Sequence, residues 1–98
     1  MLKTLTKDNF NEEIKNGLKL IEFYAPWCSY CRKQEEVLKE LDKIYIGQVD
    51  TEEEVELAIR YGVHSFPTFL IFRNGKEVER FSGLRNKYDL MNSVAKYL

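Results

Sequence analysis

The two cysteines of the chain, Cys28 and Cys31, are the residues whose type and spacing point most directly to chemistry. They are separated by Ser29 and Tyr30 and follow directly after Trp27. Cysteines at this spacing occur as a structural disulfide, as half of a metal site, or as a reactive dithiol. A structural disulfide here would close only a tiny loop and would remove little entropy from the unfolded chain. Two cysteines are also too few for the disulfide scaffold of a small secreted protein.

A mononuclear metal site within one chain is disfavoured because ligands are lacking. A structural zinc site pairs one C-x-x-C with a second pair of Cys or His, and only His64 remains, isolated far along the chain. A solvated loop histidine is the simpler interpretation of His64. We therefore expect no metal ion and no cofactor beyond the redox-active pair itself. A cluster or ion shared between two chains escapes this objection and stays open as an alternative.

The composition after the cysteines predicts a helix that begins at them. From Cys28 or Ser29 to Asp42 the chain is rich in Glu, Lys, Gln and Leu and has no Gly or Pro. In a helix, positions 28 and 31 lie on adjacent turns of one face, so the two sulfurs can bond with little backbone movement. Cys28 would face unpaired backbone N–H groups and the positive end of the helix dipole, which makes it the expected nucleophile. Cys31 is expected to be more buried, less acidic and suited to resolve a mixed disulfide formed at Cys28.

Hydrophobic periodicity and turn residues predict five strands that alternate with four helices. The strands are predicted at residues 2–5, 18–25, 44–50, 68–72 and 77–82, and the helices at residues 6–17, 28 or 29 to 42, 51–62 and 86–98. Asn74-Gly75, between the last two strands, is a strong hairpin signal. The order βαβαβαββα predicts an α/β fold with a central mixed sheet and helices on both faces. Pairing is expected to be parallel through the crossovers and antiparallel at the hairpin.

Individual residues predict where the helices begin and which faces they bury. Asp8 is the expected N-cap of the first helix. Thr51 and Glu54 have the spacing of a capping box, which predicts the start of the third helix. On the last helix, Leu98 is in line with the apolar residues before it and is expected to continue their stripe.

Glu22 is a lone carboxylate inside the apolar segment 18–25. A strand covered on both faces penalises the ionised form, so the pKa of Glu22 is expected to be raised. Such a group can act as a proton acceptor near neutral pH. The alternative is that Glu22 reaches an edge of the sheet and is simply solvated.

Length and charge restrict the classes of function. The 98 residues predict a single domain over residues 1–98. Lys and Arg number 15 against 16 Asp and Glu, for a net charge of -1, which lacks the footprint of a nucleic-acid or anionic-membrane binder. Lys3, Lys7 and Asp8 interrupt the N-terminal segment, and no apolar run nears about 18 residues. We therefore expect no membrane segment, no secretory signal and a cytoplasmic location.

Two segments, LIEFYAPWCSYCR and GVHSFPT, resemble the active-site segment and the cis-proline loop of the thioredoxin family. The resemblance extends along nearly the whole chain, and EFYAPWC is also similar to the catalytic domains of protein disulfide isomerases. It implies the thioredoxin fold and a thiol–disulfide oxidoreductase that reduces protein disulfides through a mixed disulfide. It also implies that Glu22 takes the proton of Cys31, through water.

The same resemblance implies a docking surface and partners. Pro67 would be cis and place the backbone of Phe66 beside the dithiol, where an extended partner segment could pair with it. Trp27 would be a rigid contact surface, and Ser29 and Tyr30 would complete the substrate-binding set. Disulfide-containing proteins are the implied substrates, and a thioredoxin-reductase-type flavoprotein or glutathione is the implied electron donor. The protein is expected to be a monomer.

Two departures from the family pattern leave alternatives open. Ser29-Tyr30 stands where thioredoxins have Gly-Pro and disulfide isomerases have Gly-His, so the redox direction does not follow by analogy. Cys-Ser-Tyr-Cys resembles the site of certain glutaredoxins, which implies a glutathione-dependent protein or an iron–sulfur-bridged dimer as alternatives. A non-catalytic adaptor of the same fold is another. Ile46 aligns with a buried lysine of the family, which leaves Glu22 without its usual cationic neighbour.

Overall fold

A five-stranded sheet in the order β1-β3-β2-β4-β5 forms the centre of the computed structural model, which describes residues 1–98. Its strands are β1 (Leu2–Thr4), β2 (Leu18–Tyr24), β3 (Ile46–Asp50), β4 (Thr68–Arg73) and β5 (Lys76–Ser82). The central strand β2 runs parallel to β3 and antiparallel to β4. β1 pairs in parallel with β3, and β5 pairs antiparallel with β4. The predicted mixed sheet is confirmed.

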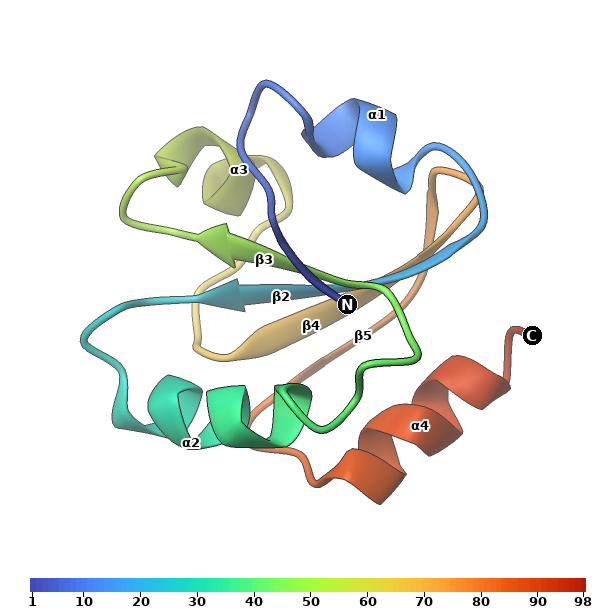
Figure 1. The fold of residues 1–98 in the computed structure, drawn as a ribbon. Helices are drawn as coiled ribbons and strands as arrows, with labels where there is room; N and C mark the ends of the chain where they lie inside the picture. The colour runs from blue at the N-terminus through green and yellow to red at the C-terminus, as the bar shows by residue number, and fades with distance from the viewer.

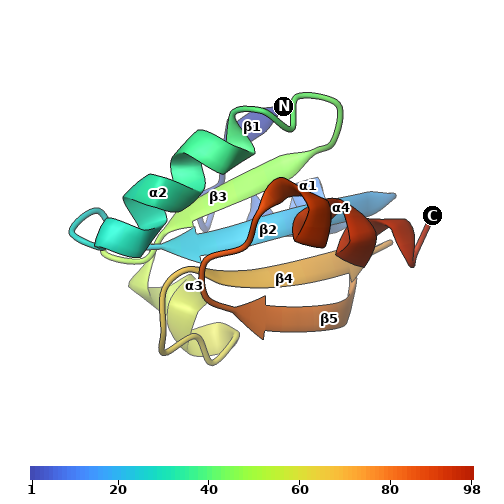
Figure 2. The ribbon, with the colours of Figure 1, turned by 90° about the horizontal axis from the view of Figure 1, so that it is seen from below.

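Four helices cover the two faces of this sheet (Figures 1 and 2). They are α1 (Phe10–Ile14), α2 (Ser29–Leu38), α3 (Val55–Arg60) and α4 (Lys87–Ala95). α1 and α3 lie on one face, and α2 and α4 lie on the other (Figure 1). None of the four has the length and apolar character needed to cross a membrane. The element order matches the predicted βαβαβαββα.

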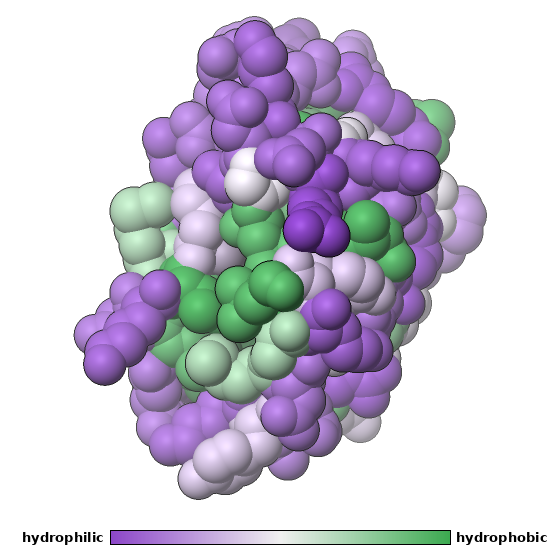
Figure 3. Space-filling view, turned by 90° about the vertical axis from the view of Figure 1, so that its right-hand side faces the viewer, coloured by the Kyte–Doolittle hydropathy of each residue, from purple (hydrophilic) through white to green (hydrophobic).

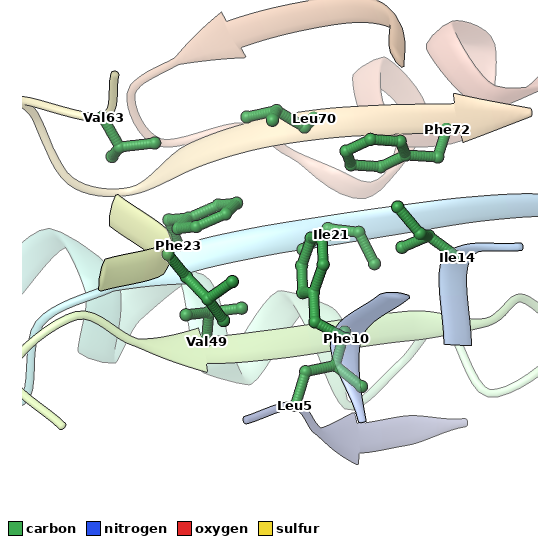
Figure 4. Close-up of a cluster of buried hydrophobic side chains, with 10 residues drawn as sticks. Leu5, Phe10, Ile14, Ile21, Phe23, Val49, Val63, Leu70 and Phe72 are labelled. Atoms are coloured by element: carbon green, nitrogen blue, oxygen red, sulfur yellow. The ribbon is translucent and has the colours of Figure 1, made fainter. Parts of the chain in front are cut away.

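Two apolar clusters fill the space between the sheet and its helices. The cluster on the α1 and α3 side is shown in Figure 4 and consists of Leu5, Phe10, Ile14, Ile21, Phe23, Val49, Leu57, Val63, Leu70 and Phe72. Successive side chains of a strand point to opposite faces, so β2 contributes Ile21 and Phe23 to this cluster and Leu20 to the other. Glu22 shares the face of Leu20, which puts its carboxyl group on the side covered by α2.

The starts of two helices differ from the prediction. The N-cap of α1 is Asn9 rather than Asp8, and the Asn9 side chain accepts a hydrogen bond from the N–H of Thr6 at 2.8 Å. α3 starts after Glu54, so the predicted capping box is wrong. The Thr51 hydroxyl instead donates to the carbonyl of Tyr24 at 2.9 Å. The Thr51 hydroxyl therefore bonds to the end of β2 instead of capping the helix as the local pattern predicts.

Two helices, α4 and α2, end earlier than predicted. α4 ends at Ala95 and Leu98 is 89 % exposed, so the apolar stripe stops at Val94. α2 ends at Leu38 rather than Asp42. The hairpin between β4 and β5 is as predicted.

The direction of β4 corrects the expectation of parallel pairing through every crossover. α3 lies in the connection between β3 and β4, and β4 pairs with β2 in antiparallel register, with Phe23 opposite Thr68. The chain therefore enters β4 from the end at which β2 and β3 finish, and β4 runs antiparallel to β2 (Figure 1). This brings the loop before β4 next to the start of α2.

The opposite end of the sheet carries an apolar hollow of about 200 Å³. Figure 3 views this side of the molecule and shows apolar surface gathered there. The hollow is lined by Leu18, Leu20, Lys43, Ile44, Tyr45, Val94 and Leu98. It lies away from the start of α2, where the cysteines are (Figure 1).

Candidate active site

Cys28 is the N-cap residue of α2, as the composition predicts. Its backbone is extended, with φ -82° and ψ 117°, and its Sγ accepts the N–H of Cys31 at 3.2 Å. Both cysteines are free thiols. The first N–H groups of a helix have no partner within the helix, and the dipole makes this end positive. A negative charge on Cys28 Sγ is therefore stabilised by the helix that it caps.

Burial of the two cysteines is nearly equal, which corrects the expectation that Cys31 is the more buried. Cys28 is 6 % exposed and Cys31 is 5 % exposed. The chain at Phe66 covers Cys28, whose S–H donates to the Phe66 carbonyl at 3.6 Å. Burial, with a smaller effect of the hydrogen bond to Cys28, raises the pKa of Cys31 to about 12. Cys31 therefore needs a base before it can attack.

A groove of about 430 Å³ opens over Cys28. Trp27 and Tyr30 are its exposed aromatic walls, at 62 % and 58 % exposure, and the Trp27 ring meets the Phe66 ring edge to face at 5.8 Å. The Phe66–Pro67 peptide bond is cis, and Pro67 itself is buried. The groove is lined by Trp27, Cys28, Ser29, Tyr30, His64, Ser65 and Phe66. His64 is exposed at the rim.

Glu22 lies in the centre of the sheet and is 1 % exposed, so the alternative of a solvated edge residue is wrong. Its Oε1 accepts a hydrogen bond from Gln48 Nε2 at 3.0 Å, whereas Oε2 is buried without a partner. Burial raises the pKa of Glu22 to about 7, the negative charge of Glu35 adds to the rise, and the Gln48 bond opposes it. Ile46, two residues before Gln48, is fully buried among apolar side chains.

Two neighbours of Glu22, Gln48 and Glu35, were not predicted from the sequence. Gln48 is the residue of β3 directly opposite Glu22, a pairing that depends on the strand register. Glu35 lies four residues after Cys31 on α2, and this spacing is the one signal that could have placed it on the dithiol face.

A second hollow, of about 200 Å³, shares no lining residue with the groove over Cys28. Its lining residues are Tyr24, Ala25, Pro26, Cys31, Arg32, Glu35 and Gln48. Cys28 thus lines the groove and Cys31 lines this second hollow. The structure contains no group of three or more His, Cys, Asp or Glu side chains placed to hold a metal ion.

Comparison with known proteins assigns this arrangement to a family. The sequence model of the family described as Thioredoxin matches residues 1–96. The chain belongs to the thioredoxin family. The thioredoxin of Chlamydia caviae is 39 % identical over 98 residues, which cover 96 % of each chain. Mouse protein disulfide-isomerase A4 is 41 % identical over 98 residues, which cover 91 % of this chain and 15 % of that longer protein.

A solved structure agrees with the thioredoxin assignment. A mutant thioredoxin from Halobacterium salinarum superposes with a TM-score of 0.90 at 28 % identity, covering 98 % of this chain and 89 % of its own. The expected thioredoxin fold is confirmed. With its two cysteines brought together at the start of α2, this thioredoxin-family protein is a thiol–disulfide oxidoreductase.

Proposed function

We propose that the protein reduces disulfides of other proteins, as a single-domain monomer with the Cys28–Cys31 pair as its only redox group. The observation that carries this proposal is the position of Cys28 Sγ, which caps α2 and faces the groove. A thiolate at this position is both stabilised and within reach of a partner.

The reaction takes place in two thiol–disulfide exchanges. The Cys28 thiolate attacks the partner disulfide, one partner sulfur leaves as a thiolate, and a mixed disulfide forms. Cys31 then loses its proton and attacks Cys28 Sγ, which releases the second partner thiolate and forms the Cys28–Cys31 disulfide. Two electrons have passed from the dithiol to the partner.

Glu22 is the base that we assign to Cys31. With a pKa of about 7 it is a carboxylate in part of the molecules at neutral pH and still binds a proton well. Its hydrogen-bond partner Gln48 lines the same hollow as Cys31, and its charge contributes to the raised pKa of Cys31. The proton passes from Cys31 to Glu22 through water in this proposal.

The groove is the docking surface that we propose for partner proteins. Trp27, Tyr30 and Phe66 offer rigid aromatic area at low entropic cost, and Ser29 adds a hydroxyl. Pro67, buried after its cis bond to Phe66, completes the set. The backbone of Phe66 lies beside Cys28, and an extended segment of the partner would pair with it.

The electron donor that we propose is a thioredoxin-reductase-type flavoprotein or glutathione, and the compartment is the cytoplasm, where thiols are kept reduced. The reduction potential of the Cys28–Cys31 pair against a glutathione series tests the direction. A value near about -270 mV supports a reductant, and a value between about -180 and -120 mV identifies an isomerase or oxidant instead.

The activity itself is tested by the reduction of insulin disulfides with dithiothreitol as the electron source. The protein is expected to accelerate the precipitation of insulin chains, and Cys28→Ser is expected to abolish the acceleration. Glu36→Gln, which changes an exposed side chain on the same helix, is the matched control. Equal rates with and without the protein would contradict the proposal.

A further inference from the structure

One amide group joins the buried carboxylate to a second carboxylate at the surface. Gln48 Nε2 donates to Glu22 Oε1 at 3.0 Å and to Glu35 Oε1 at 2.6 Å. An amide nitrogen carries two N–H donors, so both bonds form at once. They hold the two carboxylate oxygens within about 6 Å, the range in which like charges affect one another.

The second hollow connects this pair of carboxylates to Cys31. Cys31, Glu35 and Gln48 all line it, whereas Glu22 lies behind Gln48. A volume of about 200 Å³ has room for several water molecules, and the polar lining offers them partners. Glu35 is half-buried, so its outer side reaches solvent.

We propose that Glu35, held in place by Gln48, is the outer carboxylate of a two-carboxylate proton path that serves Cys31 through the second hollow. Gln48 is a positioning residue in this path, and Glu35 carries the proton only after Glu22 has released it. The inference rests on the proposed role of Glu22 as the base for Cys31.

The proton balance of the path is simple. When Cys31 attacks, its proton passes through water to Glu22, whose unpartnered Oε2 is the oxygen free to bind it. Glu22 later returns to the carboxylate by passing the proton out past Gln48 to water in the hollow, and from there to Glu35. Glu35 releases it to bulk solvent, and the Gln48 amide keeps its own protons throughout.

The charged and titratable groups around Glu22 determine in which direction a substitution shifts the pKa of Glu22. From α2, Cys31 and Glu35 face it, and Arg32 lines the hollow. Tyr24 is the next titratable group along β2, and Asp50 acts on Tyr24 from β3. β4 presents the apolar Phe69 opposite Glu22.

Two substitutions are expected to shift the titration of Glu22 in opposite directions. Glu35→Gln removes a negative charge that disfavours ionised Glu22, so the midpoint falls by about 0.5 to 1 pH unit. Gln48→Met removes the donor that favours ionised Glu22, so the midpoint rises. Glu36→Gln has the same change of charge on the same helix, and its exposed partner is Lys39, so it leaves the midpoint unchanged.

The experiment measures this midpoint in two ways on the reduced protein. NMR of the side-chain carboxyl groups follows Glu22 directly and needs no activity. Stopped-flow reaction with excess dithiobis-nitrobenzoate follows the resolving step, as the concentration-independent second phase of thionitrobenzoate release. Its pH profile is expected to move with the NMR midpoint, downward in Glu35→Gln and upward in Gln48→Met.

The outcomes separate this inference from the proposed function. Opposite shifts in Glu35→Gln and Gln48→Met, with none in Glu36→Gln, support the path. A Glu35→Gln midpoint equal to that of Glu36→Gln overturns it, while two normal phases of thiol release would leave the dithiol mechanism intact. Absence of the second phase in the unmodified protein would instead overturn the dithiol mechanism, and this inference with it.

Discussion

The buried carboxyl group of Glu22 makes a prediction about stability that is independent of any substrate. Its pKa is raised from the ordinary value of 4.5 to about 7, mainly by burial. Between these two values the folded state binds more protons than the unfolded state. The free energy of unfolding therefore falls as the pH rises through this range, and the full penalty is present above the folded pKa.

The size of the effect follows from the difference between the two pKa values. For a side chain that is 1 % exposed, this difference corresponds to a loss of about 3 kcal/mol in the free energy of unfolding when Glu22 is ionised. Glu22→Gln keeps the shape and an acceptor for Gln48 but carries no charge. The variant is therefore expected to gain up to about 3 kcal/mol relative to the unmodified protein between about pH 5 and pH 8.

Urea unfolding of both reduced proteins across this pH range, followed by circular dichroism, measures the difference. Glu36→Gln is the control, because it removes a carboxylate at an exposed position of α2. A difference between Glu22→Gln and the unmodified protein that does not change with pH would refute the reasoning.

Two further substitutions test the docking surface and the packing. Trp27→Ala is expected to lower kcat/KM for insulin about 10-fold, because an exposed aromatic wall of the groove is lost. The rate with a small aromatic disulfide is expected to change by no more than about 2-fold. Equal losses for both substrates would argue against docking through Trp27. Gly47→Ala places a Cβ 2.5 Å from Leu5 Cδ1 and 2.8 Å from Ile21 Cδ1. The free energy of unfolding, measured with urea, is therefore expected to fall by about 1 to 3 kcal/mol. A change below about 0.5 kcal/mol would show that these side chains can move aside without loss of stability.

The sequence predicted the site where the signal is local. The spacing of Cys28 and Cys31, the helix that follows them and the lone Glu22 in an apolar strand are all visible within a few residues. Gln48 became a neighbour of Glu22 only through the register of β3 against β2, which no local pattern specifies.

The predictions that were wrong also concern contacts between residues far apart in the sequence. Thr51 has the spacing of a helix cap but bonds to the end of β2, because a partner brought close by the fold competes with the local one. The direction of β4 appears only in its pairing with β2, whose residues lie about 50 positions earlier in the chain. Burial of Cys28 comes from Phe66, which lies 38 positions along the chain.

The two cysteines line separate hollows, which has a consequence for large partners. A protein docked over Trp27 and Tyr30 would seal the groove above Cys28 from water. The hollow beside Cys31 shares no lining residue with the groove, so it is expected to stay wet in such a complex. Resolution is therefore expected to proceed at a similar rate for a short peptide and for a bulky folded protein, since neither covers the side from which the proton leaves.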